Sequence, residues 1–323
     1  MTANDMEARP ETLRPEGVPN LSVPHAVLPF YLAHAPVRGR LVRLGPLAHA
    51  LLSRHNYPDE VLKLGGQALA LVACMATALK FEGSFSLQIK GDGPVSLLLA
   101  DCTDKGALRF TAQLNEEAPS RLPAEPSALL GKGYLAFTVD QGADTERHQG
   151  IVALEGDSLS GMAEHYFSTS EQYPCFIRLF SERLNGEWQA AALVLERIAG
   201  EGGQAQELTD NDEFDDAWET ACTFAASLKQ SEIFDHALGS SALVRRLFGT
   251  LDVVEGTFRP LSFGCRCNRE RLATLLETFG DDDLDHMAED GIIQMDCNFC
   301  NTHFTFPRDT LSHTGHKASM SIS

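Results

Sequence analysis

Two short cysteine motifs near the C-terminus decide how this chain folds: Cys265-Arg266-Cys267 and Cys297-Asn298-Phe299-Cys300. Thiolate sulfur is a soft ligand, and four thiolates complete the tetrahedral shell of a structural Zn²⁺ ion. A CxC motif facing a CxxC motif across a short insert therefore predicts one four-thiolate zinc site in the reduced protein. Its metal ligands would be Cys265, Cys267, Cys297 and Cys300. The spacing leaves two alternatives open, namely four buried structural cysteines or two standing disulfides.

The length and charge of the chain limit its possible partners. A chain of 323 residues is long enough for two domains. The formal net charge of −19 argues against nucleic acid as the main partner, because binding there depends on Lys and Arg that neutralise phosphates. The same charge argues against binding to anionic membranes, and it favours solubility.

The N-terminal region shows no secretory signal, because residues 1–20 are polar, contain several prolines and lack an apolar core. The longest apolar run, Ala68–Leu79, is broken by Thr77 and flanked by Lys63 and Lys80. It therefore predicts a core helix and no membrane span. We expect a cytoplasmic protein, in which thiols stay reduced and spaced cysteines indicate metal or redox chemistry.

Residues 21–200 are predicted to form an α/β body with an antiparallel sheet, which gives an α+β fold class. A helix begins at Tyr57-Pro58-Asp59-Glu60 and keeps apolar residues at helical spacing to Leu79. The period then changes to two, and 81–90 and 95–100 predict a hairpin. Further strands are expected at 40–44, 106–113, 134–139, 150–154, 176–180 and 190–198.

Three features of the body could suggest other chemistry. Gly91-Asp92-Gly93 lacks the Gly-Lys-Ser/Thr ending of a phosphate loop, so we expect a turn. Ser158 and His165 could suggest a hydrolase, but Ser160 stands where a nucleophile elbow needs its second glycine. We expect Ser158 or Asp157 to be the N-cap of a helix from about 159 to 170. Cys74 lies beside the apolar face of the long helix and is expected in the core.

Residues 201–256 are predicted to be a metastable helical linker. From Ala199 to Leu228 there is no Lys or Arg, whereas eight residues are acidic. Three short amphipathic patterns follow one another, each too short for a helix that is stable alone. Like charges at this density weaken helices further, so the segment must gain its stability from docking. A plain helical subdomain is the alternative.

Residues 257–310 are predicted to form a small zinc-binding domain, followed by a tail at 311–323. Asn268-Arg269-Glu270-Arg271 opens a helix to about Phe279, and a second short helix is expected at 284–289 after three capping aspartates. Strands then place the CxxC motif at the tip of a hairpin, a zinc-knuckle geometry, whereas a thioredoxin-type CxxC opens a helix. His286 and His303 are spare ligand candidates, and His313 and His316 lie in the tail.

The predicted domain has little core, so zinc would supply most of its folding free energy, about 10–16 kcal/mol of apparent binding. Oxidants attack thiolates, and loss of the metal would remove the main stabiliser of the domain. The released cysteines have nearest neighbours in the sequence, Cys265 with Cys267 and Cys297 with Cys300. A CxC disulfide closes a tight ring and is expected to be strained and reversible. The site is therefore expected to sense oxidation.

With these motifs the chain resembles the redox-regulated 33-kDa heat-shock chaperonin family, which are bacterial holdase chaperones. Phe263 before the CxC motif and the helix start at 268–271 after it are similar to the zinc domain of that family. The likeness covers about residues 25 to 308. The matching motifs of the body are Leu79–Gly83, Gln88–Pro94, Gln149–Val152, Leu154–Leu159 and Glu164–Phe167.

The resemblance implies a chaperone with no enzymatic activity. Under oxidative stress combined with unfolding conditions, zinc would leave and disulfides Cys265–Cys267 and Cys297–Cys300 would form. The linker would then unfold, and the protein, as a homodimer when activated, would bind unfolding client proteins without ATP and prevent their aggregation. The N-terminal extension and four additional cysteines depart from the family pattern. These cysteines are Cys74, Cys102, Cys175 and Cys222.

Two other functional classes remain as alternatives. The first is a zinc-ribbon interaction module for nucleic acid. Residues 258–323 hold six Lys or Arg and ten Asp or Glu, which argues against this class. The second is a thiol oxidoreductase that uses Cys297 and Cys300, and it would need an exposed thiol of low pKa that is free of metal.

Overall fold

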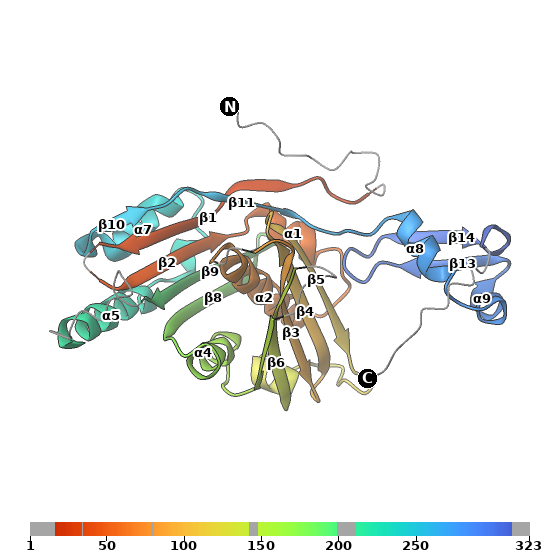
Figure 1. Ribbon diagram of the computed structural model, residues 1–323, viewed down its shortest axis with the longest axis horizontal. Coiled ribbons are helices and arrows are strands. Elements are labelled where there is room, and N and C mark those ends of the chain that lie inside the picture. The colour runs from red at the N-terminus through yellow and green to blue at the C-terminus, as the bar shows by residue number, and fades with distance from the viewer. Residues whose placement is uncertain (1–16, 34, 79–80, 142–147, 199–210, 312–323) are drawn as a thin grey trace. The chain divides into compact units, whose positions relative to one another are not determined.

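The computed structural model describes residues 17–33, 35–78, 81–141, 148–198 and 211–311 (Figure 1). The chain divides into two compact units, and the larger one spans Asn20–Gly264. The smaller unit contains 265–311, called the C-terminal module below. Both expected tails lie largely outside the described residues, as do His313, His316 and positions 201–210 of the expected linker.

The larger unit is built on one sheet, called the main sheet, which has 11 strands in the described chain (Figure 1). The order is β7-β6-β3-β4-β5-β11-β1-β2-β9-β8, and β10 also pairs with β1. The strand bounds are β1 Ser22–Leu32, β2 Val37–Arg43, β3 Ser84–Gly91, β4 Val95–Thr103, β5 Ala107–Leu114, β6 Gly133–Asp140, β7 His148–Ala153, β8 Cys175–Leu184, β9 Glu187–Arg197, β10 Val253–Glu255 and β11 Arg259–Phe263. Together with its helices, the sheet confirms the predicted α+β class.

Most strands follow the alternation of the sequence. The expected hairpin is present as the antiparallel pair β3–β4, and Gly91-Asp92-Gly93 lies in its turn with no helix after it. The strand β1 was not predicted, because it contains Pro24 and Pro29, which cannot donate to a ladder. Its pairing with β11 shifts register between Val23 and Val27, and an irregularity of this kind tolerates proline.

The two halves of the main sheet are joined by β11, which pairs antiparallel with β1 and parallel with β5. The parallel pairing is short, with Ser262 opposite Ala107 and Phe263 opposite Leu108. Residues 259–263 were expected in the zinc-binding domain, but they belong to the main sheet. The compact unit that contains the cysteine motifs begins at Cys265.

The core helix of the larger unit is α2 (Asp59–Ala78), and 14 of its 20 residues are buried. By length and composition it could cross a membrane, but 78% of its apolar window is covered inside the structure. Gly65 and Gly66 bring the helix close to the sheet, because a Cβ atom at Gly65 would lie 2.4 Å from Cζ of Phe110. The buried Cys74 lies in this helix, as expected.

The smaller helices of the body complete the core around the sheet. They are α1 (Pro46–Leu52), α3 (Pro126–Leu130) and α4 (Leu159–Thr169). The predicted N-cap of α4 is confirmed, since Ser158 Oγ accepts a hydrogen bond of 3.1 Å from the Gly161 amide. The ring of His165 points elsewhere, with Nε2 at 3.6 Å from a carboxylate oxygen of Glu155.

Three helices and a short turn cover one face of the main sheet. They are α5 (Asn211–Ala226), α6 (Gln230–Ile233), α7 (Ser240–Phe248) and η2 (Gly249–Leu251), and 211–248 is called the linker segment below. Figure 1 shows α5 beside β8 and α7 beside β10. The shared core contains, from the helices and the turns between them, Ala221, Ala225, Leu228, Ile233, Leu243, Val244 and Phe248, and from the strands Leu28, Phe30, Leu32, Val37, Leu41, Phe180, Ala191, Leu193 and Leu195.

The C-terminal module contains α8 (Arg269–Leu276), α9 (Asp281–Met287), η3 (Arg308–Thr310) and the antiparallel sheet β12-β13-β14. The strands are Ala288–Glu289, Ile292–Asp296 and His303–Pro307. The first helix ends at Leu276 and not at Phe279. The second begins at Asp281, so the aspartates form its first turn, where negative charge is favourable. The core is small: Leu276, Leu284, Ile293, Phe304, Phe306 and Leu311.

Replacing Gly65 with Ala tests the close packing of α2. The helix would gain up to about 1 kcal/mol in propensity. The new Cβ atom would collide with the fully buried Phe110 ring, and overpacking of this kind costs about 1–3 kcal/mol. We expect a net loss of stability, measured as a lower urea midpoint. Gly249→Ala is the control, because no atom lies within 4 Å of its Cβ position. Equal midpoints for both variants would contradict the packing argument.

Candidate metal centre

The local fold of the C-terminal module fixes both cysteine motifs. Directly after the CxC motif, Oδ1 of Asn268 accepts a hydrogen bond of 2.7 Å from the Arg271 amide and caps α8. The CxxC motif forms the tip of the β13–β14 hairpin. There the amide of Cys297 donates to the Thr302 carbonyl (3.0 Å), and the amide of Cys300 donates to the Cys297 carbonyl (3.2 Å). A side-chain cap therefore orders the chain after the CxC motif, and backbone hydrogen bonds hold the CxxC motif.

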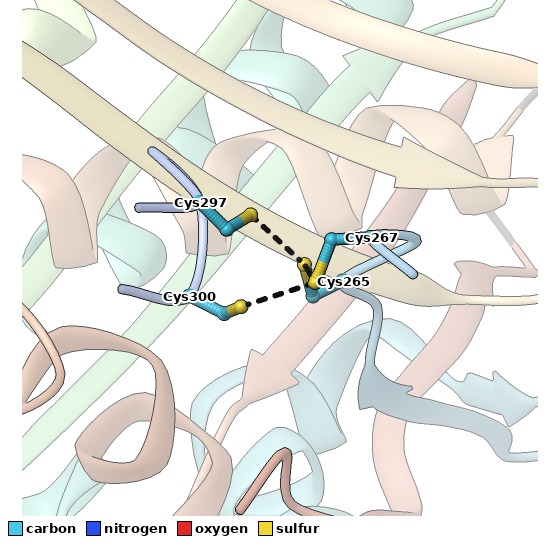
Figure 2. Close-up of side chains that lie close together, drawn as sticks. All are labelled: Cys265, Cys267, Cys297 and Cys300. Atoms are coloured by element: carbon cyan, nitrogen blue, oxygen red, sulfur yellow. Dashed lines mark hydrogen bonds between the residues drawn. The ribbon is translucent and has the colours of Figure 1, made fainter. Parts of the chain in front are cut away.

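The four sulfur atoms point toward one another (Figure 2). All four lie within 4.8 Å of each other, and we call this group the four-cysteine cluster. The Sγ atoms of Cys265 and Cys267 are 3.3 Å apart. The distance is 3.5 Å from Cys265 to Cys297 and also from Cys267 to Cys300. The structure thus brings together every residue that the spacing singled out as a ligand.

These distances distinguish between the possible states of the sulfurs. A disulfide bond is about 2.05 Å long, so no pair in the cluster is bonded. In a tetrahedral zinc site with Zn–S bonds of about 2.3 Å, the sulfurs stand about 3.8 Å apart. The observed separations are close to that value, and the donor set is entirely sulfur. The geometry and chemistry of the cluster fit a soft divalent metal ion.

The thiols share protons and therefore differ in their pKa values. Hydrogen bonds from Cys265 and then Cys267 lower the pKa of Cys297, and they lower the pKa of Cys300 to about 6. Hydrogen bonds with Cys265 and the other sulfurs raise the pKa of Cys267. Four thiolates at this distance repel one another, and a bound cation would remove that cost.

Backbone amides and one hydroxyl support the sulfurs. The amide of Cys267 bonds to Cys265, and the amide of Phe299 bonds to Cys297. Sγ of Cys300 lies 3.1 Å from the Thr302 hydroxyl. Thr302 was not predicted, because a hydroxyl two residues after a ligand has no distinguishing pattern in the sequence.

The spare histidine candidates lie outside the cluster. His286 Nδ1 is 2.6 Å from the carbonyl oxygen of Asp282, in its own helix. His303 Nδ1 is 2.8 Å from the Asp296 carboxylate across the hairpin. Each imidazole therefore has a local partner, and the group of possible ligand atoms in the described chain consists of the four sulfurs.

The other four cysteines are free thiols in the larger unit. Cys74 and Cys102 are buried, whereas Cys175 and Cys222 are partly buried. Burial raises the pKa of Cys74 to about 12 and the pKa of Cys222 to about 11, and it also raises that of Cys175. Thiols of this kind hold their protons at neutral pH and react slowly with oxidants.

Comparisons with known proteins agree with one another. The family model described as Hsp33 protein matches residues 25–307. The 33 kDa chaperonin of Caulobacter vibrioides is 34% identical over 282 residues, which cover 84% of this chain and 91% of that protein. The 33 kDa chaperonin of Shewanella woodyi is 35% identical over 280 residues, with 86% and 91% covered.

A solved structure is also similar to this chain. It is the 33 kDa chaperonin (heat shock protein 33 homolog) from Thermotoga maritima. The TM-score is 0.72 at 20% sequence identity, and the match covers 89% of this chain and 96% of that one. At this level of identity the likeness concerns the fold.

Replacing Cys300 with Ser tests the metal centre, because it removes a buried sulfur and leaves three ligands. We expect the metal content after dialysis against a mild chelator to fall from one ion per chain to near zero. Loss of one of four ligands should weaken metal binding strongly, because a closed structural site requires its complete ligand set. The control is Cys222→Ser, a half-buried thiol in α5, which should keep one ion. Full metal retention by the Cys300 variant would exclude four-sulfur coordination.

Proposed function

The chain belongs to the Hsp33 protein family, and we propose that it is a redox-regulated molecular chaperone of the holdase type. It binds unfolding proteins and prevents their aggregation under oxidative stress. The observation that carries this proposal is the four-cysteine cluster, with four thiols within 4.8 Å in a small module. Such a site depends on the reduced state of every sulfur, so it responds directly to oxidants.

We assign one Zn²⁺ ion to Cys265, Cys267, Cys297 and Cys300. When bound, the ion keeps the four sulfurs as thiolates and cross-links the two motifs. The chain itself contributes only six buried apolar side chains to the core of this module. A core of this size is too small to hold the fold without a cross-link, so metal loss is coupled to unfolding.

The oxidative step joins sulfurs that are neighbours in the sequence. The Cys265 and Cys267 thiolates lose two electrons and form one S–S bond, and Cys297 and Cys300 form another. For each bond one hydrogen peroxide molecule accepts two electrons and two protons and becomes two water molecules. The spatial distances of 3.3 and 3.5 Å are nearly equal, so proximity alone does not select the pairs. Sequence adjacency supports the assignment.

The linker segment supplies the client-binding response. Its helices have 16, 4 and 9 residues, and the two shorter ones are too short to persist in water alone. The longer helix, α5, contains several acidic residues and no Lys or Arg, and like charges weaken it. They cover an apolar face formed by β1, β2, β8 and β9. Release of the segment would expose both that face and its own apolar side, and large apolar surfaces bind unfolded chains. We further propose that the activated form is a homodimer and acts in the cytoplasm.

The proposal includes no catalytic activity. An oxidoreductase CxxC motif opens a helix, where the N-terminal dipole stabilises the thiolate. Here Cys297 and Cys300 lie in the turn between two strands, β13 and β14. The geometry therefore favours a metal knuckle over a catalytic dithiol.

Peroxide at raised temperature should convert the protein to its active form. We expect one zinc ion to be released per chain and the free thiol count to fall from eight to four, because the four protected cysteines keep their protons. Suppression of client aggregation should rise in parallel. Equal suppression before and after oxidation, with zinc retained, would exclude the switch.

Release of the linker segment should be visible in tryptophan fluorescence. The chain has two tryptophans, of which Trp218 lies on α5 against the shared core and Trp188 is buried on β9. We expect a red shift of Trp218 emission on activation in a Trp188→Phe variant, because its ring would become hydrated. The Trp218→Phe variant should show little shift. An unchanged spectrum of Trp218 in fully active protein would place client binding elsewhere.

A further inference from the structure

The first part of the linker segment is acidic and has no cation of its own before Lys229, whereas Arg245 near its C-terminal end pairs with Glu255 of β10. Between residues 199 and 228 the chain has no Lys or Arg. Three arginines on strands of the main sheet reach the segment instead: Arg43 on β2, Arg178 on β8 and Arg197 on β9. Arg43 and Arg178 bind backbone carbonyl groups of the segment, whereas Arg197 pairs with a carboxylate. This difference determines which arginines hold the segment on the sheet.

Arg178 binds the end of α5 through two nitrogens. Its Nη1 donates to the carbonyl of Ala226 at 2.5 Å, and its Nη2 donates to the carbonyl of Leu228 at 3.2 Å. Ala226 is the last residue of α5, where carbonyl groups lack helical partners and the helix dipole is negative. The guanidinium also lies 5.3 Å from the centre of the Phe180 ring, which fixes its orientation.

Arg43 binds two carbonyl groups of the segment, one in α6 and one in the turn before α7. Its Nη1 donates to the carbonyl of Leu238 at 2.5 Å, and its Nη2 donates to the carbonyl of Glu232 at 3.1 Å. Burial lowers the pKa of Arg43, and the nearby Asp235 charge opposes this effect. A guanidinium that is half buried by the segment is held there by its hydrogen bonds, since loss of its partners would leave a desolvated charge.

Arg197 makes a different contact, an ion pair with Asp215 of α5. The Arg197 side chain is 30% exposed and that of Asp215 is 52% exposed, so the pair is accessible to solvent. Exposed ion pairs contribute little and are screened by salt. Both hydrogen bonds of Arg43 are partly buried, as is the bond of Arg178 to Leu228, whereas its bond to Ala226 is exposed. Each of these arginines joins two separate carbonyl groups of the segment, whereas Arg197 makes a single exposed ion pair.

We propose that Arg43 and Arg178, the arginine pair, hold the linker segment on the main sheet and set the threshold at which it is released. The inference rests on the proposed function, in which release exposes the client-binding surface. The two residues act through the segment and not on clients, so they are positioning residues. Their chemistry requires arginine, because a planar guanidinium can bridge two carbonyls, whereas a lysine ammonium is a point donor on a flexible stem.

The test uses full-length, reduced and zinc-loaded protein. The variants are Arg43→Gln, Arg178→Gln, the double variant and the conservative Arg178→Lys. The matched control is Arg183→Gln, which removes another arginine of β8 whose side chain is exposed and lies 3.8 Å from the exposed Asp59 carboxylate. Hydrogen exchange is measured in 211–248 and in α2, together with zinc content and suppression of client aggregation without peroxide.

In the double variant we expect exchange in 211–248 to accelerate by at least about tenfold, because hydrogen bonds to charged groups contribute that much. Exchange in α2 and zinc content should stay unchanged, and suppression of aggregation should appear before oxidation. The Arg178→Lys variant should lie between wild type and Arg178→Gln, and Arg183→Gln should match wild type, because an exposed ion pair contributes little.

Two results would overturn the proposal about the arginine pair. One is a hydrogen-exchange rate in 211–248 of the double variant that equals the wild-type rate. The other is equal acceleration in α2, which would indicate general destabilisation of the body. A third result separates the two proposals. Fast exchange confined to 211–248 with no gain in aggregation suppression would support the arginine pair and contradict the proposed link between release and client binding.

Discussion

The structure of the C-terminal module depends on the meeting of four sulfur atoms from two separate motifs. Residues 265–267 and 297–300 converge within 4.8 Å, and the apolar core beside them has only six buried side chains. In larger domains a metal cross-link adds to a stable core, whereas the zinc ion proposed for this module would take the place of one. With that ion, the fold of the module would depend on the reduced state of its cysteines.

The order of the elements along the chain shows how the cysteines are connected to the linker segment. The module begins at Cys265, directly after Gly264 and β11, which joins the two halves of the main sheet. β10 pairs with β1 just before it, and the linker segment precedes β10. The sequence order is thus linker segment, β10, β11, module. Along the chain, the cysteines are therefore connected to the linker segment through these two strands, and β11 pairs with β5 at Ser262 and Phe263.

The elements with strong local signals were predicted from the sequence. The spacing of the cysteines indicated the cluster, Ser158 indicated the start of α4, and helical periodicity after Pro58 indicated α2. Features that depend on distant contacts were not predicted. The prolines of β1 argue against a strand in the sequence pattern. The position of β11 between β5 and β1 depends on pairing between distant segments, which no local pattern indicates. The contacts of Arg43 and Arg178 with backbone carbonyls could not be predicted either, because every residue has a backbone carbonyl whatever its type.

The linker segment lies between two strands of the same sheet, since β9 ends at Arg197 and β10 begins at Val253. A segment anchored at both ends gains less conformational freedom on leaving its site than a free tail would gain. Its effective concentration near the sheet stays high, on the order of millimolar for tethered groups. In the proposed mechanism, redocking is an intramolecular step that competes with a bound client for the same apolar face. Such competition would give the protein a built-in route for client discharge that needs no external energy source.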